Sequence, residues 1–189
     1  MKILLVNDIE NNAGMRVRQI ADSAIVASGK PLFVPDFAGR FSARLGLAVR
    51  IDRLGKHIDA RFAHRYFQQA TVCCVVSGSD WADADVNPET DARALSFDGS
   101  LLMGNFQPYD GKSDLSLTLS IDGEPKQDWR WNNAAGKLQQ AISNVSRYFT
   151  LKMGDLLICD SEGEQAELHI GGKLTAAING NESLTIRLR

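Results

Sequence analysis

Histidine and cysteine are both scarce in this 189-residue chain, which contains three of each. A zinc-type site needs several such side chains at short, regular spacing. His57 and His64 are seven residues apart, and His169 is distant from both. We therefore predict structural or surface roles for the histidines and no metal site built from them.

The cysteines are Cys73, Cys74 and Cys159. An odd number, with two of them adjacent, does not form a disulfide framework. Side chains of neighbouring residues on a strand point to opposite faces, so Cys73 and Cys74 are poorly placed to share one ion. We expect buried thiols that pack as small hydrophobic groups, in a reducing compartment, most simply the cytoplasm.

The chain also lacks a large excess of either charge. It has 21 basic and 23 acidic side chains, a net charge of -2, and no apolar run near the roughly 20 residues needed to cross a bilayer. The short apolar start at residues 1–6 is followed at once by Asp8 and Glu10, which does not resemble a signal peptide. These features predict no nucleic-acid partner and no membrane partner.

Common catalytic and ligand-binding motifs are missing as well. There is no Gly-x-Ser-x-Gly nucleophile motif, and Gly171-Gly172 precedes no helix that could bind phosphate. The acidic series Asp80, Asp83 and Asp85 lacks the glycine and the final glutamate of a calcium loop, so we interpret residues 77–93 as a solvated loop.

What is present is a series of short strands with two helices. Alternating apolar residues predict strands over 45–51, 115–121 and 184–188, and apolar runs predict strands over 2–6, 70–76 and 156–159. Asp122-Gly123 suits a tight turn that leads to a return strand over 127–131, and residues 167–170 and 173–176 are interpreted as a second hairpin. Helical spacing marks residues 59–69 and 134–149. This pattern predicts a β-rich α+β fold in one domain, residues 1–189.

Basic residues cluster between positions 40 and 56. Arg44 and Arg50 have the same parity on the predicted strand, so both side chains can face one side of a sheet. This arrangement is compatible with an anion-binding pocket and also with an ordinary solvated face.

Several segments together resemble the fumarylacetoacetate hydrolase family, in particular its short bacterial hydroxyheptadiene-dioate isomerase or hydratase-like members. They are residues 29–37, 47–51, 54–58, 97–100, 121–124 and 145–155. The resemblance runs from about Asp22 to the C-terminus. It implies a mixed β-roll and sandwich of short strands with two main helices, and it also implies a homodimer.

The resemblance further implies metal-assisted cleavage, hydration, isomerisation or decarboxylation of oxo-acids, with Mg²⁺ or Mn²⁺ held by a Glu-x-Glu pair and a later Asp. Those three positions are Arg44, Gly46 and Val75 in this chain. A guanidinium repels a divalent cation and offers hydrogen-bond donors only. We therefore predict that neither metal is bound, and that Arg44 fills the space of the ion and binds a small carboxylate.

Other motif positions depart from the family too. The motif arginine is Ser79, the lysine before Phe97-Asp98-Gly99 is Leu95, and the Thr-Gly-Thr-Pro loop is represented by residues 159–162, of which only Ser161 is chemically similar. Trp131 replaces a small hydroxyl residue, and the lid region 7–28 is degenerate, with no match to the family's catalytic His and Glu.

Three functions follow from this pattern. The favoured hypothesis is a non-catalytic binding or interaction protein with a small carboxylate ligand. The second is a hydrolase, isomerase or decarboxylase of oxo-acids with altered, metal-independent chemistry, and the third is a structural subunit whose cleft is filled by Arg44 and Trp131. We assign no catalytic residue, and the predicted cleft residues are Arg44, Ser77, Asp80, Asp98, Trp131 and Ser161.

Overall fold

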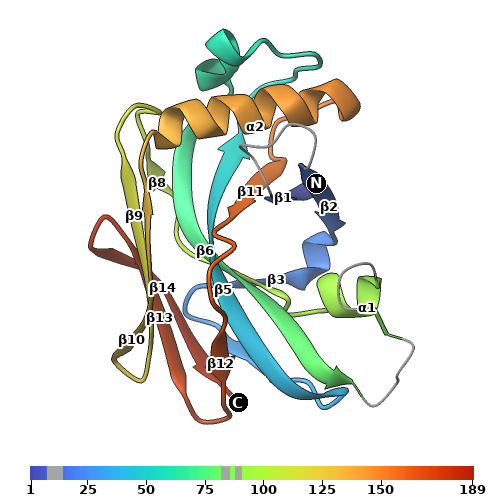
Figure 1. Cartoon of the computed structure of the whole chain (residues 1–189), viewed down its shortest axis with the longest axis vertical. Helices are drawn as coiled ribbons and strands as arrows, with labels where there is room; N and C mark the ends of the chain where they lie inside the picture. The colour runs from blue at the N-terminus through green and yellow to red at the C-terminus, as the bar shows by residue number, and fades with distance from the viewer. Residues whose placement is uncertain (8–14, 82–85, 88–90) are drawn as a thin grey trace.

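The computed structural model describes residues 1–7, 15–81, 86–87 and 91–189. Two β-sheets form most of the fold (Figure 1). The larger sheet has nine strands. Its main path is β2 (Arg16–Ile20), β1 (Ile3–Asn7), β11 (Leu156–Asp160), β5 (Ala38–Ile51), β6 (Phe67–Trp81), β7 (Leu101–Met103) and β3 (Ile25–Ala27). Two short strands lie beside this path: β12 (Ala166–Leu168) pairs with β5, and β8 (Gln107–Pro108) pairs with β6.

The second sheet has five strands, in the order β10 (Glu124–Trp131), β9 (Leu115–Ile121), β13 (Lys173–Ile178), β14 (Asn181–Leu188) and β4 (Pro31–Leu32). In β9, every second residue from Leu115 to Ile121 is buried, as the alternation predicts. Gly123, with φ of +83°, makes the tight turn into β10, a conformation that glycine adopts without strain.

The helices lie at the edges of these sheets. They are α1 (Ala92–Leu95), α2 (Ala134–Tyr148), and the 3-10 helices η1 (Asp22–Ala24) and η2 (Ala60–Tyr66). Figure 1 shows α2 lying across the end of both sheets, with the segment around η2 outside it. The apolar stripe of α2, from Ala134 to Val145, packs into the main core.

Two cores lie on opposite faces of the nine-stranded sheet. Odd-numbered residues of β5, such as Leu45 and Leu47, join the second sheet and α2 in the larger core, whereas Ala48 joins the smaller core. The smaller core takes residues from β1, β2, β5, β6, β7 and β11, so the sheet curls around this inner face. The β-rich α+β fold, a mixed roll and sandwich, is therefore as predicted.

Three local predictions need correction. Residues 59–69 do not form one helix, because the 3-10 helix η2 ends at Tyr66 and β6 begins at Phe67. Residues 167–170 and 173–176 do not pair as a hairpin, because β12 adds to β5 in one sheet whereas β13 pairs with β9 and β14 in the other. Residues 77–81 are strand rather than loop, because β6 continues as the partner of the long β5. Asp83 and Asp85 lie outside the described residues, as do residues 8–14 of the predicted lid.

Among the residues that the structure describes, no helix is long and apolar enough to cross a bilayer.

Candidate functional site

The inner face of the curled sheet changes from apolar to polar at one end. Its apolar part includes Leu5, Ala48 and Cys73. Side chains alternate along each strand, so residues two or four positions further along the same strands continue this face. Those residues are Asn7 on β1, Arg44 and Gly46 on β5, Val75 and Ser77 on β6, and Asp160 on β11.

Asp160 is the centre of this polar end. Its carboxylate is buried, and it accepts hydrogen bonds from Arg44 Nε to Oδ1 at 2.6 Å and from Arg44 Nη2 to Oδ2 at 2.5 Å. Asn7 Nδ2 donates to Oδ2 at 2.9 Å, and the backbone N–H of Glu162 donates to Oδ1 at 3.1 Å. A buried carboxylate is stable only with such partners, and these fix the guanidinium of Arg44 in one orientation.

Arg18 extends this network across β2. Its Nη2 donates to Asn7 Oδ1 at 2.9 Å and lies 3.9 Å from Asp160 Oδ2. Two arginines therefore approach one buried carboxylate. The arrangement concentrates positive charge and hydrogen-bond donors on this end of the inner face.

Gly46 packs closely against the smaller core beside the ion pair. It is the register partner of Asp160, and a Cβ atom there would lie 3.1 Å from Cys73 Sγ and 3.2 Å from Ile158 Cγ2. A longer side chain at this position would displace the small inner core. Arg44 and Asp160 thus meet beside a position where no side chain projects.

Gln127 supports Arg44 from the other sheet. Its Oε1 accepts from the N–H of Leu45 at 2.9 Å, and its Nε2 donates to the carbonyl of Ala43 at 2.9 Å. β5 pairs with β11 up to Gly46 and with β12 from Ala43, so the ladder is interrupted at Arg44. The amide of Gln127 satisfies the backbone on both sides of that gap.

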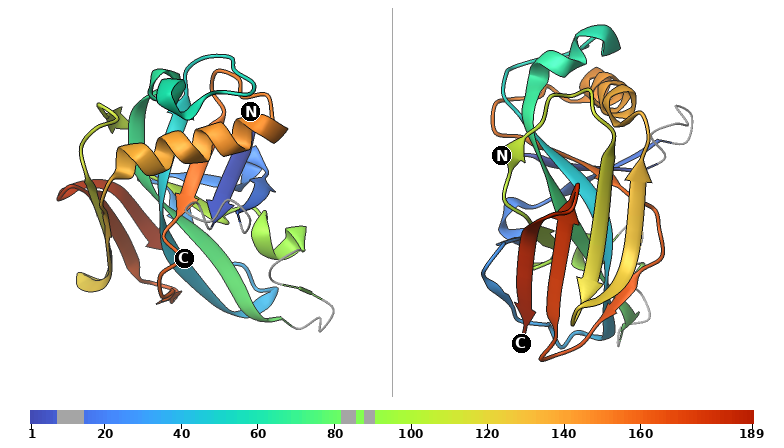
Figure 2. Two further views of the ribbon diagram at one scale, coloured as in Figure 1. Left: turned by 45° about the horizontal axis from the view of Figure 1, so that its top comes forward. Right: turned by 90° about the vertical axis from the view of Figure 1, so that its left-hand side faces the viewer.

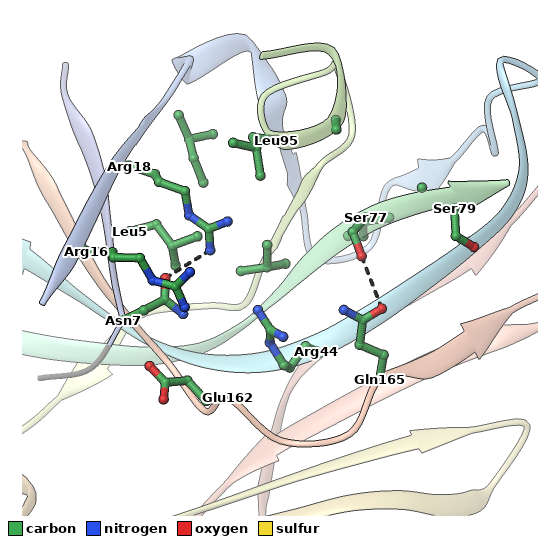
Figure 3. Close-up of a pocket in the computed structure, with 15 residues that line it drawn as sticks. Leu5, Asn7, Arg16, Arg18, Arg44, Ser77, Ser79, Leu95, Glu162 and Gln165 are labelled. Atoms are coloured by element: carbon green, nitrogen blue, oxygen red, sulfur yellow. Dashed lines mark hydrogen bonds between the residues drawn. The ribbon is translucent and has the colours of Figure 1, made fainter. Parts of the chain in front are cut away.

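A cleft of about 500 Å³ opens above this network (Figure 3). Its charged and polar lining includes Asn7, Arg16, Arg18, Arg44, Ser77, Glu162 and Gln165. Gln165 Oε1 accepts from Ser77 Oγ at 3.3 Å, and Figure 3 shows the amide nitrogen of Gln165 on the side of Arg44.

Arg44 is about one-fifth exposed. Because its Nε and one Nη2 hydrogen are used by Asp160, the edge formed by Nη1 and Nη2 is the one directed away from that carboxylate.

Of the six predicted site residues, Arg44 and Ser77 line this cleft. Asp80 lies at the exposed end of β6 and pairs with Arg40 Nε at 2.7 Å. Asp98 is exposed in the turn after α1. Ser79 and Leu95, which precede these two residues in the sequence, line the cleft, but Asp80 and Asp98 themselves do not.

Trp131 and Ser161 also lie elsewhere. Trp131 is 4% exposed in the larger core and its ring centroid lies 5.1 Å from that of Trp129, so it cannot fill the cleft. Ser161 lines a small separate pocket beside Gln127, although Glu162 and Gln165 on the same connection between β11 and β12 line the cleft. The third hypothesis, a cleft filled by Arg44 and Trp131, is not supported by this geometry.

Sequence reasoning did not single out Asp160, Asn7, Arg18 or Gln165. One usable signal was the alternation of Arg16 and Arg18 before Ile20, which is strand spacing with both arginines on one face. The partnership of Asn7 with Asp160 spans 153 residues, and only the parallel pairing of β1 with β11 brings them together.

The cysteines are buried, as predicted, and none forms a disulfide. Cys74 packs in the larger core and Cys73 in the smaller one, on opposite faces of β6. Burial raises the pKa of Cys74 to about 12, and burial together with neighbouring thiols and Asp160 raises the pKa of Cys73 well above its usual range. Neither thiol is a reactive thiolate.

The three positions that the family resemblance assigns to metal ligands do not suit a divalent cation. Arg44 is paired with Asp160, Gly46 has no side chain, and Val75 is apolar. Hard cations bind through several oxygen atoms, and none of these residues supplies a side-chain oxygen. Among the described residues, no group of three or more His, Cys, Asp or Glu side chains is arranged to hold a metal ion.

Comparison with known families and structures agrees with the fold. The family model for the fumarylacetoacetate hydrolase C-terminal domain matches residues 17–186. This chain belongs to the fumarylacetoacetate hydrolase family. Among curated relatives of the family, the mouse mitochondrial oxaloacetate tautomerase FAHD1 is 23% identical over 176 residues, which cover 88% of this chain and 77% of the relative. The Escherichia coli oxaloacetate tautomerase YcgM is 31% identical over 100 residues, covering 51% of this chain and 45% of the relative.

Solved structures of the family share the architecture. A fumarylpyruvate hydrolase from Pseudomonas aeruginosa, in complex with Mn²⁺ and pyruvate, superposes with a TM-score of 0.80 at 20% identity, and the match covers 100% of this chain and 89% of the hydrolase chain. A probable 2-hydroxyhepta-2,4-diene-1,7-dioate isomerase from Mycobacterium abscessus has a TM-score of 0.84 at 13% identity, and the match covers 100% of this chain and 75% of the isomerase chain. At these identities the likeness establishes the fold.

Proposed function

We propose that the cleft binds a small carboxylic acid of the oxo-acid class through Arg44, without a divalent metal ion. One observation carries this proposal. The buried Asp160 holds Arg44 by one edge of its guanidinium, and the remaining edge belongs to a side chain that lines the cleft. A guanidinium fixed in this way can bind a carboxylate by two parallel hydrogen bonds with little loss of conformational entropy.

The surroundings of Arg44 favour the same class of ligand. Arg16 and Arg18 add positive charge, and the amide nitrogen of Gln165 adds a donor on the side of Arg44 (Figure 3). The lining of the cleft is mixed, because the apolar residues Leu5, Ile20 and Leu95 join the polar ones. A short carbon chain that carries one or two carboxylates would use both parts.

A second function is metal-independent conversion of an oxo-acid in the same cleft. Family membership weighs towards this alternative, because the curated relatives are named as tautomerases and the solved structures as hydrolases or isomerases. Ser77 and Glu162 line the cleft with Arg44 and could exchange protons with a ligand. Binding through Arg44 is common to both functions, and turnover separates them.

The binding test is calorimetric titration with pyruvate, oxaloacetate and oxalate in the presence of a chelator. The double variant Arg44→Gln with Asp160→Asn removes both charges of the pair but keeps polar groups of similar size. We expect oxalate to bind the native protein in chelator and to bind the double variant at least 100-fold more weakly. The matched control is Arg40→Gln, on the same strand but outside the cleft, with unchanged affinity.

The turnover test follows the enol and keto forms of oxaloacetate by ultraviolet absorbance in chelator. Acceleration that is lost in the double variant would establish the second function. Binding without acceleration would establish the first. Affinity that appears only when Mg²⁺ or Mn²⁺ is added would overturn both, because each is proposed to be metal-independent.

Two further proposals rest on the family resemblance and on composition. We infer a homodimer, which light scattering coupled to gel filtration tests directly. We also infer a reducing, cytoplasmic compartment from the three unpaired thiols.

A further inference from the structure

One end of the molecule carries an excess of cations. It is formed by residues 52–66, which include η2, and by the end of α2 with the turn that follows, residues 147–153. In Figure 1 these segments lie at the end opposite the C-terminus, and both views of Figure 2 keep residues 52–66 on the outside of α2. We call these residues the basic end. Its exposed cations are Arg53, Lys56, Arg61, Arg65, Arg147 and Lys152.

Few carboxylates balance these cations. Asp52 lies 3.4 Å from Arg53 Nε, and Asp59 lies 3.1 Å from Arg61 Nε. Asp155, next to the turn, is buried and paired with Lys2. Six cations therefore face two exposed or half-buried carboxylates, on a chain whose net charge is -2.

Large apolar side chains protrude among the cations. Met153 is 77% exposed, and Leu54 and Tyr148 are each 69% exposed. They belong to one surface, because Gly55 and Leu151 form an antiparallel bridge beside Leu54 and Met153.

Two further hydrogen bonds hold that surface together. Lys56 Nζ donates to the carbonyl of Tyr148 at 2.8 Å, and the N–H of Gly154 donates to the carbonyl of Ile51 at 2.8 Å. Exposed apolar side chains grouped in this way mark an interaction surface.

We propose that the basic end binds the surface of an anionic lipid bilayer. Lys and Arg near such a surface are attracted to its phosphate groups, and protruding Leu, Met and Tyr side chains can enter the headgroup region. Both features are needed. At 0.1 M salt, the attraction between charges is largely screened beyond about 10 Å, so the cations alone would bind weakly.

Other partners fit these residues less well. A second copy in a symmetric contact would place six cations against six, which is repulsive. Single-stranded nucleic acid needs free aromatic faces, but the Phe62 ring already has Arg61 at 4.6 Å and Arg65 at 5.0 Å from its centroid. Of the three most exposed apolar side chains here, Leu54 and Met153 have no ring, so only Tyr148 could stack on a base.

This inference differs from the expectation of no membrane partner, which used the net charge of the whole chain and the lack of a spanning segment. The fold brings six cations together at one end, whereas the net charge of the whole chain also counts carboxylates that lie far from them. Surface binding needs no spanning helix.

The test is co-sedimentation of the full chain with vesicles of phosphatidylcholine, alone or mixed with phosphatidylserine. We expect binding to the mixed vesicles only. The double variant Leu54→Ser with Met153→Ser, and separately Arg53→Gln with Lys152→Gln, should each weaken binding by about tenfold or more. All four side chains are exposed, so thermal melting should be unchanged and should verify folding.

Matched controls lie at the other end of the chain's fold. Phe33 and Ile170 are 68% and 71% exposed near the C-terminus, and Phe33→Ser with Ile170→Ser should leave vesicle binding unchanged. Lys126→Gln with Arg130→Gln, on β10, is the control for charge.

No sedimentation of the native protein, or equal loss in test and control variants, would overturn the proposal. The proposal would also be overturned if the protein bound an oligonucleotide, or polyglutamate as a model acidic polypeptide, and did not bind the mixed vesicles.

Discussion

The two ends of β11 each place a buried aspartate against the first strand of the chain, yet the two carboxylates do different things. Asp155 accepts from the N–H of Lys2 at 2.8 Å and from its ammonium, and from the N–H of Lys152 at 2.8 Å. Asp160 accepts from Asn7 and from two nitrogens of Arg44. Both are buried, and both tie β11 to residues 153 positions earlier.

The difference lies in the cationic partner and in what surrounds it. Lys2 carries a compact ammonium, and the pair with Asp155 lies outside the residues that line the cleft. Arg44 has a planar group with two usable edges, and Asp160 occupies one of them beside an open cleft. A buried ion pair can therefore stabilise the fold alone, or it can also orient a side chain that binds a ligand. The second role requires a cation that, like Arg44, still has hydrogen-bond donors directed away from the carboxylate.

The largest expected effect is at Arg44. Arg44→Gln leaves Asp160 buried without its main partner, so we expect the free energy of unfolding to fall by about 3 kcal/mol and oxalate binding to be lost. Adding Asp160→Asn should restore most of the stability but not the binding. Urea denaturation and calorimetry measure the two quantities separately. Recovery of binding in the double variant would show that Arg44 is only structural.

The next effect is at Asp155. Asp155→Asn removes the charge that holds Lys2, and we expect a loss of about 1–3 kcal/mol in the free energy of unfolding, with no change in oxalate affinity. Urea denaturation and calorimetry again give both values. A fall in affinity comparable to that of the Arg44 variants would remove the distinction between the two ends of β11.

The contribution of Asp155 should also depend on pH. Burial raises the pKa of this carboxyl, but the hydrogen bonds from Lys2 and the N–H of Lys152 outweigh burial and lower its pKa below the ordinary value. A lowered folded-state pKa gives stabilisation that is complete above the unfolded value of about 3.9 and is lost as the pH falls through the folded value. The stability difference between the native protein and Asp155→Asn should therefore shrink below about pH 4. A difference that grew with acidity would contradict this account.

A smaller effect is expected at Gln127, which positions Arg44 without lining the cleft. Gln127→Leu leaves the N–H of Leu45 and the carbonyl of Ala43 without these partners, so oxalate affinity should fall by about tenfold. Gln140→Leu is the matched control, since Gln140 donates to Asn144 on α2 away from the cleft. Equal affinities in the two variants would show that the backbone at Arg44 needs no such support.

Much of the fold could be predicted from local patterns, because alternation in β9 and the stripe on α2 reflect burial within single elements. The false hairpin at 167–176 shows the limit. A Gly-Gly pair between two short apolar segments fits a turn, but β12 is drawn to β5 by pairing that no local pattern records.

The candidate site was less predictable. Arg44 could be found from its parity with Arg50 on a strand that the sequence predicts, whereas Ser77, in a segment expected to be loop, was found only through the resemblance to the family. Asp160 could not be paired with Arg44 from the sequence, since the two residues are 116 positions apart. Only the pairing of β5 with β11 brings them together. The four other predicted residues were placed by likeness to the family, and that likeness does not show where β6, the turn after α1, β10 and the turn after β11 direct their side chains.

The most direct test of the central claim is a crystal structure of the protein soaked with oxalate and Mn²⁺ together, measured with anomalous scattering from manganese. We predict oxalate on the outward edge of Arg44, with Asp160 still on the other edge and no anomalous peak in the cleft. Manganese bound beside Asp160, with Arg44 turned out of the cleft, would contradict the account.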